Sequence, residues 1–248
     1  MRRGILITVL AVVAFVAIVI ARLPATWVIP TSSPIASCGT VDGSIWNGTC
    51  AGLTTQGKSV GDLTWDVHAL RLLTGKLSAN LALTRPSGSI RGDFDVGLDK
   101  SLTARNVLAD LPLDQDVMSL LPRNLRTVHG NAHADITFAH VVKNIVTQLQ
   151  GHIELHDLED RGQDVLPLGN YSLTFPGGSG DPTGQLQDLG GPLAVQGTVR
   201  LTQDMPGFEL QGYITPRADA APALLNQLQY LGSPDAQGRR QFGTTVTF

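Results

Sequence analysis

Aromatic and charged residues are scarce in this chain. Phe, Trp and Tyr make up 5% of its 248 residues, and Asp, Glu, Lys and Arg together make up 16%. A core left to Leu, Val, Ile and Ala suits a thin, curved sheet better than a thick globule. The formal net charge is −3 and the basic residues are scattered, so we expect no nucleic-acid partner.

Residue sets that carry out catalysis are also missing from the sequence. It contains no serine elbow, no Cys–His pair and no close carboxylate pair. The glycine-rich loop 177–181 lacks the Lys and the following helix of a phosphate cradle. The sequence therefore predicts a protein that is not an enzyme, with no catalytic residues and no cofactor.

Histidines occur in two pairs spaced four apart, His129 with His133 and His152 with His156. On a strand, residues i and i+4 lie about 13 Å apart, too far for one metal ion to join them. Neighbouring strands could still bring His133, Asp135, Glu154 and His152 together. A solvated polar face is the favoured interpretation, and we expect no metal.

Cysteine is limited to Cys38 and Cys50, which flank a glycine-rich turn region. They have neither the paired C-x-x-C spacing nor a nearby histidine, so a metal site is not favoured. In an exported domain, thiols at such a separation tend to be oxidised, and we predict a disulfide across two strands.

A long hydrophobic run occurs at the N-terminus, where Arg2 and Arg3 precede an uncharged stretch from residue 5 to 21. Such a helix spans roughly 26 Å, close to the ~30 Å hydrocarbon core of a bilayer if Arg3 and Arg22 snorkel. A cleaved signal peptide is the alternative, but no convincing A-x-A site follows Arg22. We predict residues 1–4 in the cytoplasm, an uncleaved membrane helix at 5–22, and the remainder outside.

The rest of the chain contains a proline-rich segment followed by runs in which apolar and polar residues alternate. Pro24, Pro30 and Pro34 predict a stiff linker over residues 23–38. From residue 39 to 248, apolar and polar residues alternate in short runs, which is typical of an antiparallel meander with one buried face. The clearest runs are 76–84 and a hairpin of 193–202 with 207–216, and weaker runs fall at 89–98, 130–139, 151–158, 168–175 and 183–189.

Two short helices are predicted within this sheet. The segment 114–121 is a weak candidate that Pro122 would close. The segment 219–231 carries Pro222 in its first turn and Gly232 after its end. Its apolar stripe, expected to pack against the end of the sheet, consists of Leu224, Leu225, Leu228 and Leu231.

Several short blocks, taken in order, resemble the type II secretion system protein N family, also called general secretion pathway protein N. No block is specific alone, but together they extend over nearly the whole chain. Departures are Ser44, where threonine is expected, and the cysteine pair. The blocks are 23–25, 43–48, 63–67, 72–77, 168–171, 190–197, 212–218, 228–235 and 238–239.

This resemblance implies a single-pass protein of the bacterial inner membrane with a periplasmic domain. Its partners would be other secretion-system subunits, in the inner-membrane platform and the periplasmic secretin region. The resemblance also implies likeness to AsmA-like proteins, whose curved sheets form a groove or half-barrel. A groove that binds or transports lipids or other hydrophobic ligands is therefore the alternative function.

Conspicuous residues in these blocks are candidates for interaction. Trp46, between Gly43 and Gly48, is either a core anchor whose ring lies across a neighbouring strand or a docking site for a partner. Trp65 has the same two interpretations. The C-terminal candidates are Gly232, Pro234, Gly238 and Arg239.

Overall fold

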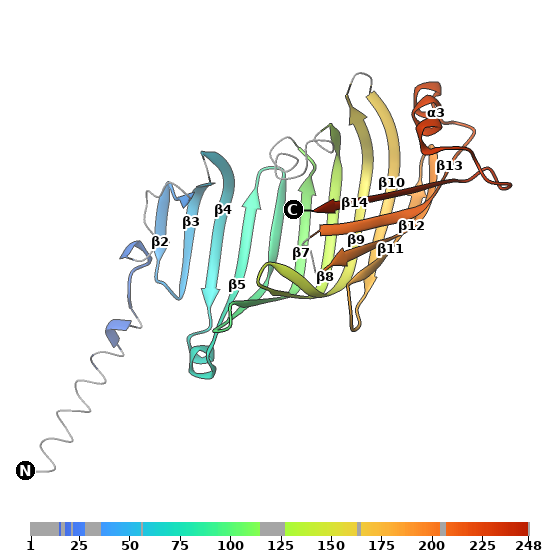
Figure 1. The fold of residues 1–248 in the computed structure, drawn as a ribbon. Helices are drawn as coiled ribbons and strands as arrows, with labels where there is room; N and C mark the ends of the chain where they lie inside the picture. The colour runs from blue at the N-terminus through green and yellow to red at the C-terminus, as the bar shows by residue number, and fades with distance from the viewer. Residues whose placement is uncertain are drawn as a thin grey trace, which may run out of the picture. The chain divides into compact units, whose positions relative to one another are not determined.

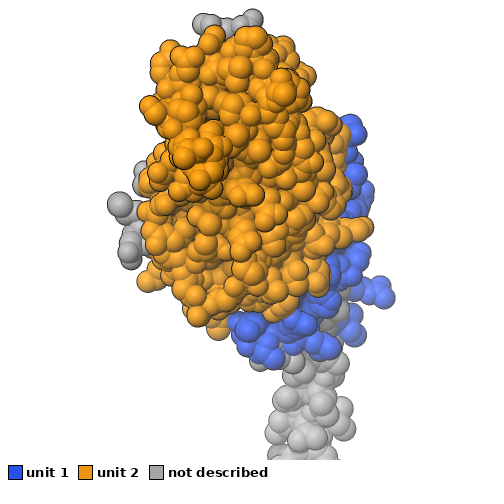
Figure 2. All heavy atoms as spheres, turned by 90° about the vertical axis from the view of Figure 1, so that its right-hand side faces the viewer, with its two compact units in different colours: residues 1–86 blue, residues 87–248 orange. Residues whose placement is uncertain are grey.

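The structure is a computed structural model that describes residues 15, 18–20, 22–27, 36–55, 57–114, 127–162, 165–203 and 207–247. Contacts divide it into two compact units, Met1–Pro86 and Ser87–Phe248, which Figure 2 colours separately. Both units consist mainly of antiparallel strands with few short helices (Figure 1), which confirms the predicted mainly β fold class.

The first unit is a small sheet in which β3 and β4 are central. β3 pairs with β4 along most of its length, and β4 pairs with β5. On its other side β3 holds β2 near its start and β1 near its end. The elements are η1 (Ala25–Trp27), β1 (Ala36–Ser37), β2 (Thr40–Gly43), β3 (Asn47–Thr55), β4 (Lys58–Val67), η2 (Ala69–Thr74) and β5 (Lys76–Arg85).

The second unit is an antiparallel meander, because each strand from β6 to β14 pairs with its neighbour in the chain. One α-helix and a short 3-10 helix interrupt it before the last strand. The elements are β6 (Gly88–Gly97), β7 (Ser101–Pro112), β8 (Val128–Val142), β9 (Ile145–Arg161), β10 (Val165–Pro176), β11 (Thr183–Gly190), β12 (Leu193–Thr202), β13 (Gly207–Pro216), α3 (Pro222–Leu228), η4 (Gln229–Leu231) and β14 (Arg240–Thr247).

Alternation predicted most of these strands. Four of the five weaker runs lie within β8 to β11, and the run 89–98 extends one residue beyond the end of β6. The predicted hairpin is formed by β12 and β13, in register from Leu193 opposite Pro216 to Thr202 opposite Gly207. In β12, Leu193 and Val195 are buried whereas Gln196 and Arg200 are exposed. Residues 204–206, predicted to form the hairpin turn, lie outside the described residues.

Strand β7 was not predicted, because its apolar residues change from even to odd positions within the strand. Leu102 and Ala104 occupy even positions, whereas Val107 and Ala109 occupy odd ones. Between them Asn106 adopts a positive φ of 50°, and the pairing register with β6 shifts there. Such a bulge moves later side chains to the other parity, so no run of period two is long enough to identify.

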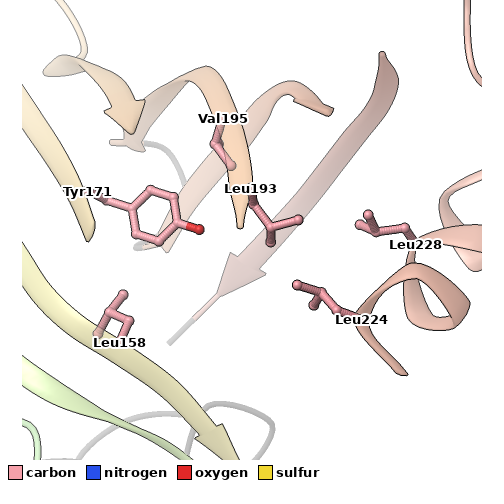
Figure 3. Packing of buried hydrophobic residues seen from close by; sticks show 6 residues of the cluster. All are labelled: Leu158, Tyr171, Leu193, Val195, Leu224 and Leu228. Carbon is pink, nitrogen blue, oxygen red and sulfur yellow. The ribbon is translucent and has the colours of Figure 1, made fainter. Parts of the chain in front are cut away.

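Helix α3 is shorter than predicted, since it begins at Pro222 and not at residue 219, and its last turn continues as η4. Leu224 and Leu228 are 3% and 6% exposed and point toward Leu193 of the sheet (Figure 3). Leu225 and Leu231 are each 39% exposed, so they do not belong to the buried stripe. Of the other predicted helix, all but Asp114 lies outside the described residues.

The predicted membrane helix is not confirmed. None of the helices in the described parts of the chain is long and apolar enough to cross a bilayer. Of the segment 5–22, however, only Phe15, 18–20 and Arg22 are described. Residues 28–35 of the predicted linker also lie outside the described residues.

Candidate functional site

The inner face of the second unit surrounds an apolar hollow of about 510 Å³. Strands β8 to β14 all contribute side chains to its walls, so the sheet of this unit curls around the space. Among the lining residues are Leu155, Leu173, Leu186, Val199, Leu210 and Phe242. Sequence reasoning missed the hollow, because each strand supplies only one to three of the residues.

Tyr171 carries the one side-chain hydroxyl among the lining residues. That hydroxyl donates a hydrogen bond of 2.6 Å to the carbonyl oxygen of Leu168. Burial, with the nearby charge of Asp188, raises the pKa of Tyr171 to about 12. The phenol therefore stays protonated, and its one proton is donated to the Leu168 carbonyl oxygen. The lining side chains can thus hold a ligand only by apolar contact.

In the first unit, the motif of Gly43 and Gly48 accommodates the ring of Trp65. A Cβ atom on Gly48 would lie 2.5 Å from Cζ2 of Trp65. Trp65 is 8% exposed, and its indole N–H donates to the carbonyl oxygen of Ser44 at 3.2 Å. Gly43 has a φ of 93°, which forms the turn into this close approach.

Trp46 lies between β2 and β3. It is half-buried, and its indole N–H donates to the carbonyl oxygen of Ile20 at 2.9 Å. Its backbone carbonyl accepts a hydrogen bond from the Val67 N–H at 2.5 Å. Trp46 therefore joins the segment before the sheet to the end of β4.

The C-terminal motif forms a tight turn before β14. Gly238 adopts a φ of 77°, and Asp235 accepts hydrogen bonds from the backbone N–H groups of Gln237 and Arg239 at 2.9 and 2.8 Å. Burial acts to raise the pKa of Asp235, but the bonds from Arg239 outweigh it and hold that pKa below its usual value. The guanidinium of Arg239 lies 4.6 Å from the ring centroid of Tyr213.

Gly232 and Pro234 begin the same turn. Gly232 has a φ of 89° and its carbonyl oxygen accepts a hydrogen bond from the Arg240 guanidinium, whereas Pro234 is exposed. The turn thereby brings the block 232–239 against the block that contains Tyr213.

A further contact, which sequence reasoning did not single out, joins two other blocks. The Arg217 guanidinium is ion-paired with Asp188 and donates to the carbonyl oxygen of Gly191 at 2.7 Å. The other oxygen of Asp188 accepts the Val195 N–H at 3.1 Å. The sequence signal that could have indicated this contact is an arginine directly after Ile-Thr-Pro at the end of a strand. Asp188, Arg217 and the backbone of Gly191 and Val195 thereby hold β11, β12 and the end of β13 together.

The two histidine pairs lie on strands, as the alternation predicted, His129 and His133 on β8 and His152 and His156 on β9. His133 is opposite Glu154 and Asp135 is opposite His152, and His152 and His156 hydrogen-bond Glu154 at 3.1 and 3.0 Å. These two bonds lower the pKa of Glu154. Within the described ranges, no group of three or more His, Cys, Asp or Glu is arranged to hold a metal.

Cys38 and Cys50 are joined by a disulfide. They are 7% and 1% exposed and pack with Ala25 and Trp65 in the core of the first unit. The bond links the residue directly after β1 to the middle of β3.

Comparisons with known proteins give one consistent result. The model of the family "Type II secretion system (T2SS), protein N" matches residues 36–243. A protein of Vibrio cholerae serotype O1 named type II secretion system protein N is 28% identical over 206 residues, which cover 82% of this chain and 81% of the relative. One of Aeromonas hydrophila with the same name is 25% identical over 246 residues, or 96% of each chain. No solved structure matches this chain significantly.

Proposed function

Because this chain belongs to the type II secretion system protein N family, we propose that it is a non-enzymatic component of the type II secretion apparatus. Its role is to contact other subunits and thereby support the export of folded proteins across the outer membrane. Both relatives carry the name of this system.

The proposed location is the inner membrane, with residues 1–4 in the cytoplasm, a helix at 5–22, a linker at 23–38 and the domain 39–248 in the periplasm. The apolar run and its flanking arginines support this orientation. The disulfide of the first unit fits an oxidising compartment.

The observation that carries the proposed contact is the edge strand β14. Among the described strands it pairs only with β13, in eight consecutive residue pairs from Gly207 opposite Thr247 to Ile214 opposite Arg240. Apart from Arg240 it carries no charge, and it has neither proline nor bulge, the usual protections of an edge. Such an edge accepts a partner strand by β-augmentation.

Photo-crosslinking in living cells tests this contact. A photoreactive residue replaces Thr244, which is exposed on β14, and in a matched control it replaces Thr198, which is exposed on the internal strand β12. We expect adducts with secretion-system subunits from position 244 and few from position 198. Equal adduct patterns from the two positions would remove the edge as the contact.

The apolar hollow favours a second candidate function, the binding of a lipid or another hydrophobic ligand. Its volume of about 510 Å³ lies within the usual range of ligand pockets, and its lining offers apolar contact alone. Val199→Trp would place a large ring inside the hollow and reduce its volume, whereas Thr198→Trp places the same ring on the exposed face. Mass spectrometry of extracted purified protein should find lipid in the second variant and less in the first, and no lipid in either would rule out this candidate.

A further inference from the structure

The 3-10 turn η2, at the tip of the β4–β5 hairpin, exposes two large apolar side chains. Leu70 is 81% exposed and Leu72 is 42% exposed. The turn has a defined geometry, since Gly75 at φ 74° ends it and donates its N–H to the Leu72 carbonyl at 3.0 Å. Two exposed leucines held at a hairpin tip indicate a contact surface more than isolated surface leucines do.

The turn itself carries cations and no acidic side chain. From Val67 to Lys76 the chain contains Arg71 and Lys76, and the acidic residue nearest in sequence is Asp66, near the end of β4. Arg71 stands between the two leucines, and Lys76 follows the turn directly. Apolar side chains interleaved with cations are typical of segments that lie in the interface of an anionic bilayer.

The position of the turn agrees with such a contact. Trp46 bonds both Ile20 and Val67, and the Ile45 N–H donates to the carbonyl oxygen of Leu23 at 3.1 Å. The chain that follows the apolar run therefore attaches at the end of β4 where η2 begins (Figure 1). Trp27, which is 78% exposed, belongs to this attached segment.

We propose that η2 is a second membrane contact, which inserts Leu70 and Leu72 into the lipid–water interface and places Arg71 and Lys76 among anionic headgroups. This inference rests on the proposed location, because the membrane is the one in which the N-terminal run lies. A helix alone lets the attached unit rotate about its axis. A second contact fixes the orientation of the first unit on the bilayer.

Fluorescence quenching in vesicles tests the contact. The full-length chain is reconstituted in phosphatidylethanolamine and phosphatidylglycerol that carry bromine on their acyl chains. A fluorophore is attached at Leu70→Cys or, as control, at Leu98→Cys, a leucine that is 89% exposed between β6 and β7. We expect quenching at position 70 to be several-fold stronger than at position 98, and equal quenching would overturn the inference.

A third label separates this inference from the proposed location. At Val12→Cys, inside the apolar run, quenching reports whether that run lies in the bilayer. Quenching at position 12 without quenching at position 70 would retain the anchor and reject the η2 contact. Quenching at neither position would reject both, and quenching at position 70 alone would support the contact while rejecting the anchor.

The charges are tested in the same vesicles. Arg71→Gln with Lys76→Gln should reduce the quenching at position 70, as should omission of phosphatidylglycerol. If neither change affects the quenching, the headgroup part of the inference is wrong. Other secretion subunits are absent from these vesicles, so the result is independent of the proposed β14 contact.

Discussion

Gly48 and Trp65 show how a single residue determines the packing of the first unit. The ring of Trp65 occupies the place where any side chain at position 48 would begin. The two residues come from neighbouring strands and face each other in the register of β3 with β4. The glycine of this block therefore serves close packing.

We expect Gly48→Ala to lower the free energy of unfolding by about 1–3 kcal/mol, the usual effect of overpacking. Chemical denaturation followed by circular dichroism measures it. In a Trp65→Phe background the smaller ring removes the contacting atom, so the same alanine should have a smaller effect. An equal loss in both backgrounds would show that the ring is not the cause.

His133 is the residue whose titration the structure predicts most directly. Its hydrogen bond to Asp110 raises its pKa above the usual 6.5. Burial opposes this rise, and the charges of Asp110, Glu154 and Asp135 add to it. Since the folded pKa is the higher one, the stabilisation is complete below about pH 6.5 and disappears as pH rises through the folded pKa.

NMR titration of the His133 ring should therefore give a pKa above that of an unstructured histidine. Asp110→Asn should shift it downward, because the carboxylate is its main cause. An unshifted His133 in the variant would contradict the assignment.

At the scale of elements, α3 closes one part of the apolar core of the second unit. Leu224 and Leu228 are four residues apart on the same face and belong to one buried cluster with Leu158, Tyr171, Leu193 and Val195 (Figure 3). Three of those partners also line the hollow, namely Leu158, Tyr171 and Val195. The helix therefore supports the wall of the candidate ligand site.

Leu224→Ala should lower the free energy of unfolding of the second unit by about 2–5 kcal/mol, because it leaves a cavity beside the sheet. Leu225→Ala removes the same atoms from a side chain that is 39% exposed and should have a much smaller effect. Hydrogen exchange of β12 and β13 amides measures both variants. Similar losses would mean that α3 does not pack as described.

At the scale of the whole molecule, the two units can be observed separately. All three tryptophans, at positions 27, 46 and 65, belong to the first unit. Tryptophan fluorescence therefore reports the unfolding of that unit, whereas hydrogen exchange of β8 and β9 reports the second. The disulfide lies in the first unit alone.

Replacing Cys38 and Cys50 together with serine should lower the stability of the first unit by about 2–4 kcal/mol, the usual loss for a buried bridge. The fluorescence transition should shift to lower denaturant concentration. Exchange of the β8 and β9 amides should remain as in the unaltered protein. If the fluorescence transition shifted and the β8 and β9 amides lost protection to the same extent, the two units would unfold as one.

The sequence predicted the strands that alternate without interruption, because a sheet with one buried face imposes a period of two on its residues. It failed at β7, where the Asn106 bulge changes the phase, and at β14, where Phe242 and Val246 are too few to form a pattern. The sequence predicted that α3 exists but not where it starts, because the helix begins at Pro222 and the predicted segment at residue 219.

Local chemistry in the sequence by itself determined the antiparallel class, the β12–β13 hairpin and the helix after it, since each depends on neighbouring residues. Only the tertiary structure decided that Gly48 faces Trp65, that Arg217 joins Asp188, and that single side chains from β8 to β14 meet around one hollow. The physical reason is that these contacts depend on strand register and sheet curvature. Both are set by the packing of residues far apart in the chain.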